Sequence, residues 1–177
     1  MANWLKQSYT NHDLQKIMTR LIEGTEVFTH MTQADLLHLL EHADKCTFPA
    51  GETILREGSR GEYLYVLVEG AVSVRKTAAG VEEELAQLAP GDSFGEMSLV
   101  DHELRSASVI ALEQCVLLRI GEGDCWRQPA VAAKLFHNIG VSLAQRLRGM
   151  NEAYLLAKPR AQTSARDKAG SEPPKQP

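Results

Sequence analysis

Apolar residues in the first part of the chain recur every three or four positions, the spacing of one face of an α-helix. They predict a first helix over residues 10–23, with Gly24 as its stop. The apolar positions of this helix are Leu14, Ile17, Met18, Leu21 and Ile22. A second helix should begin near Thr32, because Asp35 follows at the spacing of a capping box, and continue through Leu40.

From about Lys45 the pattern changes to short apolar or alternating runs, with glycine turn signals roughly every ten residues. Strands are expected around residues 45–48, 53–56, 63–68, 71–76, 82–88, 106–111 and 114–120. Gly80 lies between two alternating segments and should occupy a hairpin tip. This arrangement is typical of a small β-sandwich or jelly-roll-like barrel.

After Trp126 and Pro129 the helical period returns and predicts a long amphipathic helix. Its apolar stripe consists of Leu135, Ile139, Leu143, Leu147, Met150 and Tyr154. Gly140 and Gly149 each destabilise the helix by about 1 kcal/mol relative to alanine, so they mark positions of bending or close packing. Beyond Lys158 the proline-rich, polar composition predicts a disordered tail.

The predicted fold class is α+β: a jelly-roll-like β-barrel or sandwich flanked by N-terminal helices and a long C-terminal helix. We expect an N-terminal helical extension over residues 1–24, one domain over 25–157, and a disordered tail over 158–177. A chain of 177 residues with 44% hydrophobic content is long enough to bury one sizeable core.

Charge and composition exclude several classes of partner. Residues 1–157 carry 14 basic and 21 acidic groups, a net charge of −7 that disfavours binding to nucleic acid. No run of 18 apolar residues and no signal-peptide pattern is present, so we expect a cytoplasmic protein that does not contact a membrane. Cys46, Cys115 and Cys125 are odd in number and lack metal-type spacing, which indicates buried, reduced thiols.

An enzyme is not expected. His38 and His42 are four residues apart with Glu41 between them, but a zinc hydrolase would need the order His-Glu-x-x-His and a third ligand. Two histidines on a solvated helix face account for the pattern, and a metal-dependent sandwich enzyme is the alternative. No serine or cysteine has a neighbouring histidine that would activate it as a nucleophile.

The segment from Phe94 to Val109 carries the most specific chemistry. Gly95 allows the backbone to approach a ligand closely, and the main-chain N–H groups that follow it can face a phosphate. Arg105 can neutralise that phosphate in a fixed fork geometry. Glu96 would repel a phosphate, so it needs a donor such as a sugar hydroxyl. Together these groups indicate a nucleotide held by its sugar-phosphate end.

This segment resembles the phosphate-binding cassette of the cyclic nucleotide-binding domain family, and the resemblance extends over roughly residues 25–157. Residues 85–109 are similar to the effector domain of bacterial catabolite activators. The resemblance implies that Gly95 and the following backbone hold the cyclic phosphate, Glu96 takes the ribose 2′-hydroxyl, and Arg105 pairs with the phosphate. The cassette residues expected to line the ligand are Phe94, Gly95, Glu96, Met97, Ser98, Arg105, Ser106 and Ala107. Leu104 departs from the proline that kinase-type members often have, which affects loop stiffness.

The resemblance also implies contacts to the base. Val74, Leu85 and Ala86 would line the purine pocket. Asn151 falls where the family places a polar residue against the purine edge, but an exposed helical asparagine explains it equally well. In the catabolite activators the long helix pairs with its twin, which implies a homodimer through the C-terminal helix.

The function implied is a cyclic nucleotide sensor or adaptor that signals to a partner protein through a helix rearrangement. Ser106 favours cyclic AMP, with cyclic GMP as the alternative ligand. No helix-turn-helix follows the long helix, so we expect a module without a DNA-binding domain whose output passes to another protein. The first helix either docks a partner or packs on the barrel. The alternative function is a degenerate domain that acts as a ligand-independent interaction module.

Overall fold

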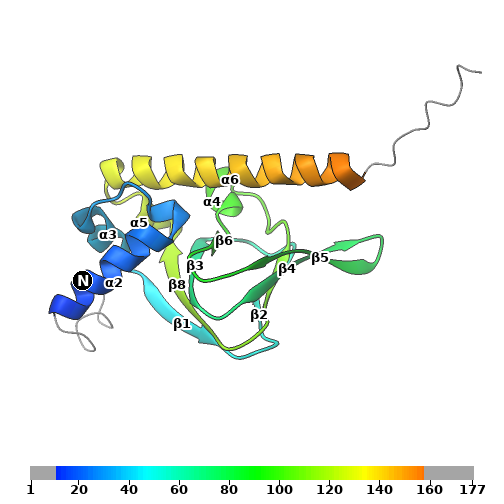
Figure 1. The fold of residues 1–177 in the computed structure, drawn as a ribbon, viewed down its shortest axis with the longest axis horizontal. Helices are drawn as coiled ribbons and strands as arrows, with labels where there is room; N and C mark the ends of the chain where they lie inside the picture. The colour runs from blue at the N-terminus through cyan, green and yellow to red at the C-terminus, as the bar shows by residue number, and fades with distance from the viewer. Residues whose placement is uncertain (1–10, 158–177) are drawn as a thin grey trace, which may run out of the picture. The chain divides into compact units, whose positions relative to one another are not determined.

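The structure is a computed structural model that describes residues 11–157. In this part of the chain, helices flank a set of strands (Figure 1). The N-terminal elements are α2 (Asn11–Gly24), the 3₁₀ helix η1 (Glu26–Phe28) and α3 (Gln33–Leu40). The strands are β1 (Asp44–Phe48), β2 (Thr53–Leu55), β3 (Tyr63–Glu69), β4 (Val72–Ala78), β5 (Val81–Leu88), β6 (Ser93–Phe94), β7 (Ser108–Ala111) and β8 (Cys115–Gly121). The remaining helices are α4 (Met97–Asp101), α5 (Glu122–Cys125) and α6 (Pro129–Ala157). The predicted α+β class is confirmed.

The strands form two antiparallel sheets, in the orders β1-β8-β3-β6 and β2-β7-β4-β5. Apolar residues from both sheets pack into one core, as expected for a sandwich whose strands bury alternate side chains. The buried members of this core are Leu55, Tyr65, Leu67, Val72, Phe94, Val109, Ala111, Cys115 and Leu117. Each of the seven predicted strands is present. β6 was not predicted, because two residues are too few to show alternation.

The β4–β5 hairpin confirms the turn predicted at Gly80. Ala78 pairs with Val81, which leaves Ala79 and Gly80 as a two-residue loop. Both loop residues have positive φ, 50° and 81°, as the tight hairpin turns that match strand twist require. The glycine adopts this conformation without strain.

The N-terminal helices pack onto one another and confirm the capping box. The Thr32 side chain accepts from the Asp35 main chain, and the Asp35 carboxylate accepts from the Thr32 N–H at 2.8 Å. Met18 and Leu21 of α2 are buried, so this face of the helix packs inside the molecule, whereas partner docking by α2 stays a prediction. Residues 1–10 and the predicted disordered tail lie outside the described residues.

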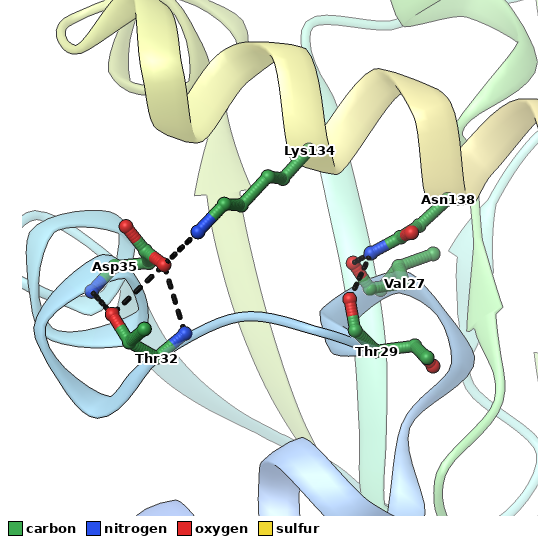
Figure 2. A network of polar contacts seen from close by, with 6 residues as sticks. All are labelled: Val27, Thr29, Thr32, Asp35, Lys134 and Asn138. Carbon is green, nitrogen blue, oxygen red and sulfur yellow. Dashed lines mark hydrogen bonds and ion pairs between the residues drawn. The ribbon is translucent and has the colours of Figure 1, made fainter.

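The first half of α6 is bonded to the N-terminal elements by buried polar side chains (Figure 2). Asn138 is 6% exposed, and its Nδ2 donates to the carbonyl oxygens of Val27 at 3.1 Å and Thr29 at 2.7 Å. These carbonyls belong to η1 and the turn that follows it. Asn138 thus fixes the spacing between α6 and η1.

Two further contacts extend this attachment in both directions along α6. The Lys134 ammonium lies 2.6 Å from Asp35 Oδ2, the same oxygen that completes the capping box (Figure 2). The buried Ser142 hydroxyl donates to the Glu26 carboxylate at 2.7 Å. The described residues divide into two compact units directly after Ser142.

The second unit begins at Leu143 and contains the rest of α6. Its apolar positions Leu147, Met150 and Tyr154 are 59%, 66% and 64% exposed. The stripe predicted on this helix therefore has two parts, because Leu135 and Ile139 in the first unit are fully buried.

Candidate functional site

The cassette begins where β6 ends. Phe94 pairs with Tyr65 of β3, and the two rings stack at 5.4 Å, which anchors this end of the cassette in the core. Gly95 then adopts φ +80°, a left-handed conformation that favours glycine, and turns the chain into α4. Glu96 occupies the N-cap position of that short helix without a side-chain capping bond, and it is 4% exposed. The predicted glycine turn and carboxylate are both present, with Gly95 half-buried and Glu96 buried.

Arg105 lies at this turn. Its side chain is 5% exposed; Nη1 donates to the Gly95 carbonyl at 2.6 Å and Nη2 to the Tyr63 carbonyl at 2.8 Å. Its Nε is buried and has no hydrogen-bond partner. Burial lowers the pKa of Arg105, and the nearby Tyr65 and Glu96 act in the opposite direction without cancelling this effect. A buried cation held chiefly by neutral carbonyls is poorly compensated, so an anion beside it would be stabilised.

The main chain of Arg105 is held as firmly as its side chain. Its N–H donates to the Ser59 carbonyl at 2.8 Å, and its carbonyl accepts from the Gly58 N–H at 2.9 Å. The loop between β2 and β3 therefore carries the end of the cassette. Ser59 and Tyr63 were not predicted as site residues, because their main-chain carbonyls leave no mark in the sequence.

The rest of the predicted cassette lies on α4 and directly before β7. Ser98 on α4 is buried, Ala107 is half-buried, and Met97 is 44% exposed. The Ser106 hydroxyl lies 3.6 Å from the Met97 sulfur, which places these two residues side by side. The structure thus brings Gly95, Glu96 and Arg105 together. Their roles toward a ligand stay predictions.

The residues expected at the purine lie on neighbouring strands. Val74 pairs directly with Ala86 across the hairpin and with Val109 on the other side, so β4 is adjacent to the strand that follows the cassette. A bulge beside this pair leaves Leu85 as the extra residue on β5, and its side chain is 55% exposed. Asn151 is an exposed residue of α6 in the second unit. Its contact with a base stays a prediction.

Arg105 also borders a cavity of about 490 Å³ that the sequence did not indicate. The lining comes from β2, β3 and the loop between them, and includes Arg56, Arg60 and Tyr65. Three arginines therefore line one hollow in a chain whose residues 1–157 are strongly acidic. Glu62 also lines the hollow, so the lining keeps an excess of positive charge, which favours anions.

The side chains considered as metal ligands form no metal-binding group among residues 11–157. His38 and His42 are exposed, and no group of three His, Cys, Asp or Glu side chains in this range is placed to hold a metal ion. Within the same range, no helix has the length and apolar character needed to cross a membrane. Cys115 and Cys125 are buried and Cys46 is half-buried, and all three are free thiols.

Comparison with known proteins assigns the chain to a family. The sequence profile of the cyclic nucleotide-binding domain matches residues 45–128. The Cyclic AMP receptor protein of Thermus thermophilus is 36% identical over 132 residues, which cover 72% of this chain and 59% of that protein. The chain belongs to the cyclic nucleotide-binding domain family, as the cassette indicated.

Solved structures agree with this assignment. The N-terminal domain of a transcriptional regulator from Streptomyces coelicolor has 31% identity and a TM-score of 0.61, covering 80% of this chain and 99% of that one. The regulatory domain of Toxoplasma gondii PKA, crystallised with cAMP, has 25% identity and a TM-score of 0.60, covering 66% and 44%. The chain thus spans less than two thirds of both the Thermus and the Toxoplasma proteins.

Proposed function

We propose that this chain binds a cyclic nucleotide at the cassette of residues 94–107, with cyclic AMP preferred over cyclic GMP. The observation that carries the proposal is the buried guanidinium of Arg105, bonded to the Gly95 carbonyl inside the cassette. A cyclic phosphate seated there would accept charge-assisted hydrogen bonds and compensate a cation that has already lost its hydration. The cAMP named for the Thermus and Toxoplasma relatives supports this ligand class.

Glu96 would bind the ribose of the same nucleotide. Its carboxylate is buried close enough to Arg105 to affect the pKa of that group. A ribose 2′-hydroxyl could donate to this carboxylate while the adjoining phosphate meets the guanidinium, so one ligand would contact both groups. The base would then lie against Val74, Leu85 and Ala86.

The bound nucleotide would act as a signal, without a catalytic step, in a cytoplasmic sensor or adaptor. Residues 129–142 of α6 are bonded to η1 and α3 through Lys134, Asn138 and Ser142. We place the response in the following segment, 143–157, because it belongs to the second compact unit. Its exposed Leu147, Met150 and Tyr154 would meet an effector protein or a second copy of the chain.

Calorimetric titration with cyclic AMP, cyclic GMP and 5′-AMP tests the ligand. Cyclic AMP should bind most tightly, and 5′-AMP should bind at least about tenfold more weakly because its doubly charged, ring-opened phosphate does not match the pocket. Equal affinity for both cyclic nucleotides would remove the preference for cyclic AMP.

Arg105→Ala tests the site. Losing a buried charge-assisted contact should cost roughly 2–5 kcal/mol of binding free energy. Arg127→Ala is the matched control, because its guanidinium is 60% exposed and pairs with Asp124 away from the cassette. A change below a few tenths of a kcal/mol in Arg105→Ala would show that Arg105 does not hold the phosphate.

Thermal unfolding separates a sensor from a degenerate interaction module. Cyclic AMP at 100 times its dissociation constant should stabilise the folded chain by about 2.7 kcal/mol. No stabilisation by millimolar cyclic AMP or cyclic GMP would favour the ligand-independent module.

A further inference from the structure

The guanidinium of Arg105 lies between glycines from two different loops. One is Gly95 of the cassette, and the other is Gly61, in the loop between β2 and β3. A Cβ atom at position 61 would lie 2.8 Å from Nη1 of Arg105 and closer still to its Cζ and Nε. Real Cβ atoms do not come this close to other heavy atoms, so a side chain at position 61 and the observed Arg105 cannot coexist.

Gly61 is needed for space and not for backbone conformation. Its φ lies outside the left-handed region, unlike the φ of +80° at Gly95. An alanine could therefore adopt the backbone of Gly61 without strain. What the glycine provides is the absence of a side chain where the guanidinium lies.

We propose that Gly61 is a positioning residue of the nucleotide site and acts through Arg105; this inference rests on the proposed function. The atoms that a Cβ would meet are the far end of a flexible side chain, so Arg105 would move and the backbone would stay. The hydrogen bonds of the Arg105 main chain to Gly58 and Ser59 hold that backbone in place. The displaced guanidinium would lose its bonds to the Gly95 and Tyr63 carbonyls, and with them its alignment toward the phosphate.

A double-mutant cycle measured by calorimetry with cyclic AMP tests this coupling. Gly61→Ala should weaken binding about tenfold or more in the wild-type background, and less than about twofold in an Arg105→Ala background. Gly123→Ala is the matched control, because Gly123 also has an ordinary backbone and nothing within 4 Å of its Cβ position. Unchanged affinity in Gly61→Ala, or equal losses in both backgrounds, would overturn the proposal.

A second measurement needs no nucleotide and separates this inference from the proposed function. Because Arg105 Nε is buried, its N–H should give a slowly exchanging NMR signal, assigned by its loss in Arg105→Lys. Gly61→Ala should shift this signal and speed its exchange, whereas Gly123→Ala should leave it unchanged. An unaltered signal in Gly61→Ala overturns the role of Gly61, even if wild-type protein binds cyclic AMP. Altered exchange without any nucleotide binding would support Gly61 as the spacer while the proposed function fails.

Folding of the variant is itself informative. Gly61→Ala should still fold, with a melting temperature lowered by the loss of the two Arg105 side-chain hydrogen bonds, because the loop backbone keeps its place. Should the single variant fold poorly, recovery in Gly61→Ala/Arg105→Ala would show that the clash is with Arg105. Poor folding in both would place the role of Gly61 in the loop and contradict the proposal.

Discussion

Asn138→Asp should weaken the attachment of α6 to η1 while keeping the size of the side chain. In the wild type, Nδ2 of Asn138 donates to the carbonyls of Val27 and Thr29 at 3.1 and 2.7 Å. An ionised carboxylate has no hydrogen to donate, so it would place an oxygen against two carbonyl oxygens in a buried position. Both hydrogen bonds would be lost and replaced by repulsion.

The two lost hydrogen bonds set the expected loss of stability in Asn138→Asp. Leaving a buried acceptor unsatisfied costs about 1–3 kcal/mol, so losing two such bonds should lower the free energy of unfolding by about 2–6 kcal/mol. For a chain of this length each kcal/mol shifts the melting temperature by about 2–4 °C, which predicts a fall of at least about 4 °C. The loss should shrink as the pH falls toward the pKa of the new carboxyl group, because its protonated form can donate one hydrogen bond.

Urea unfolding at pH 7 and pH 5, followed by circular dichroism, measures both effects. His137→Ala is the control, because this exposed neighbour on α6 should change stability by less than about 0.5 kcal/mol. An Asn138→Asp protein that unfolds within that same margin of wild type would refute the reasoning. The contacts in Figure 2 would then contribute nothing to holding α6.

Two other expectations follow from the helices. The pKa of Asp35 is lowered from 3.8 to about 2, chiefly by its hydrogen bond to Lys134, so the stability it adds is complete above its ordinary pKa and is lost as the pH falls toward 2. The free energy of unfolding, measured as the pH is lowered, should show this loss in wild type and not in Asp35→Asn. If the two proteins lose stability identically with pH, the prediction is wrong. If the exposed stripe on α6 joins two copies, wild type should sediment as a dimer and Leu147→Glu/Met150→Glu as a monomer. A monomeric wild type would contradict the dimer.

Local signals predicted most of the fold because they depend on near neighbours in the sequence. The capping box of Thr32 and Asp35 involves residues three apart, and the hairpin at Gly80 joins adjacent strands. β6 and η1 span two and three residues, too few for any period to appear, so they went unpredicted.

The candidate site also contains some residues that the sequence indicated and others that it did not. Gly95, Glu96 and Arg105 lie within eleven positions of one another, and their residue types alone indicated an anion site. Gly61 and the Tyr63 carbonyl could not be found, because one acts by lacking a side chain and the other through its main chain. Asn138 bonds residues more than a hundred positions earlier, a separation at which a single sequence gives no signal.

The pairing of β1 with β8 determines when the first sheet can form during synthesis of the chain. β1 has β8 as its neighbour in the first sheet, and Arg119 of β8 donates to Asp44 of β1, 75 residues earlier. A ribosome adds about 5–20 residues per second, so β1 emerges seconds before its partner strand exists. Until then its open edge can pair with other nascent chains. Translation that stops before Cys115 would release a cassette whose first sheet lacks β8, the strand between β1 and β3.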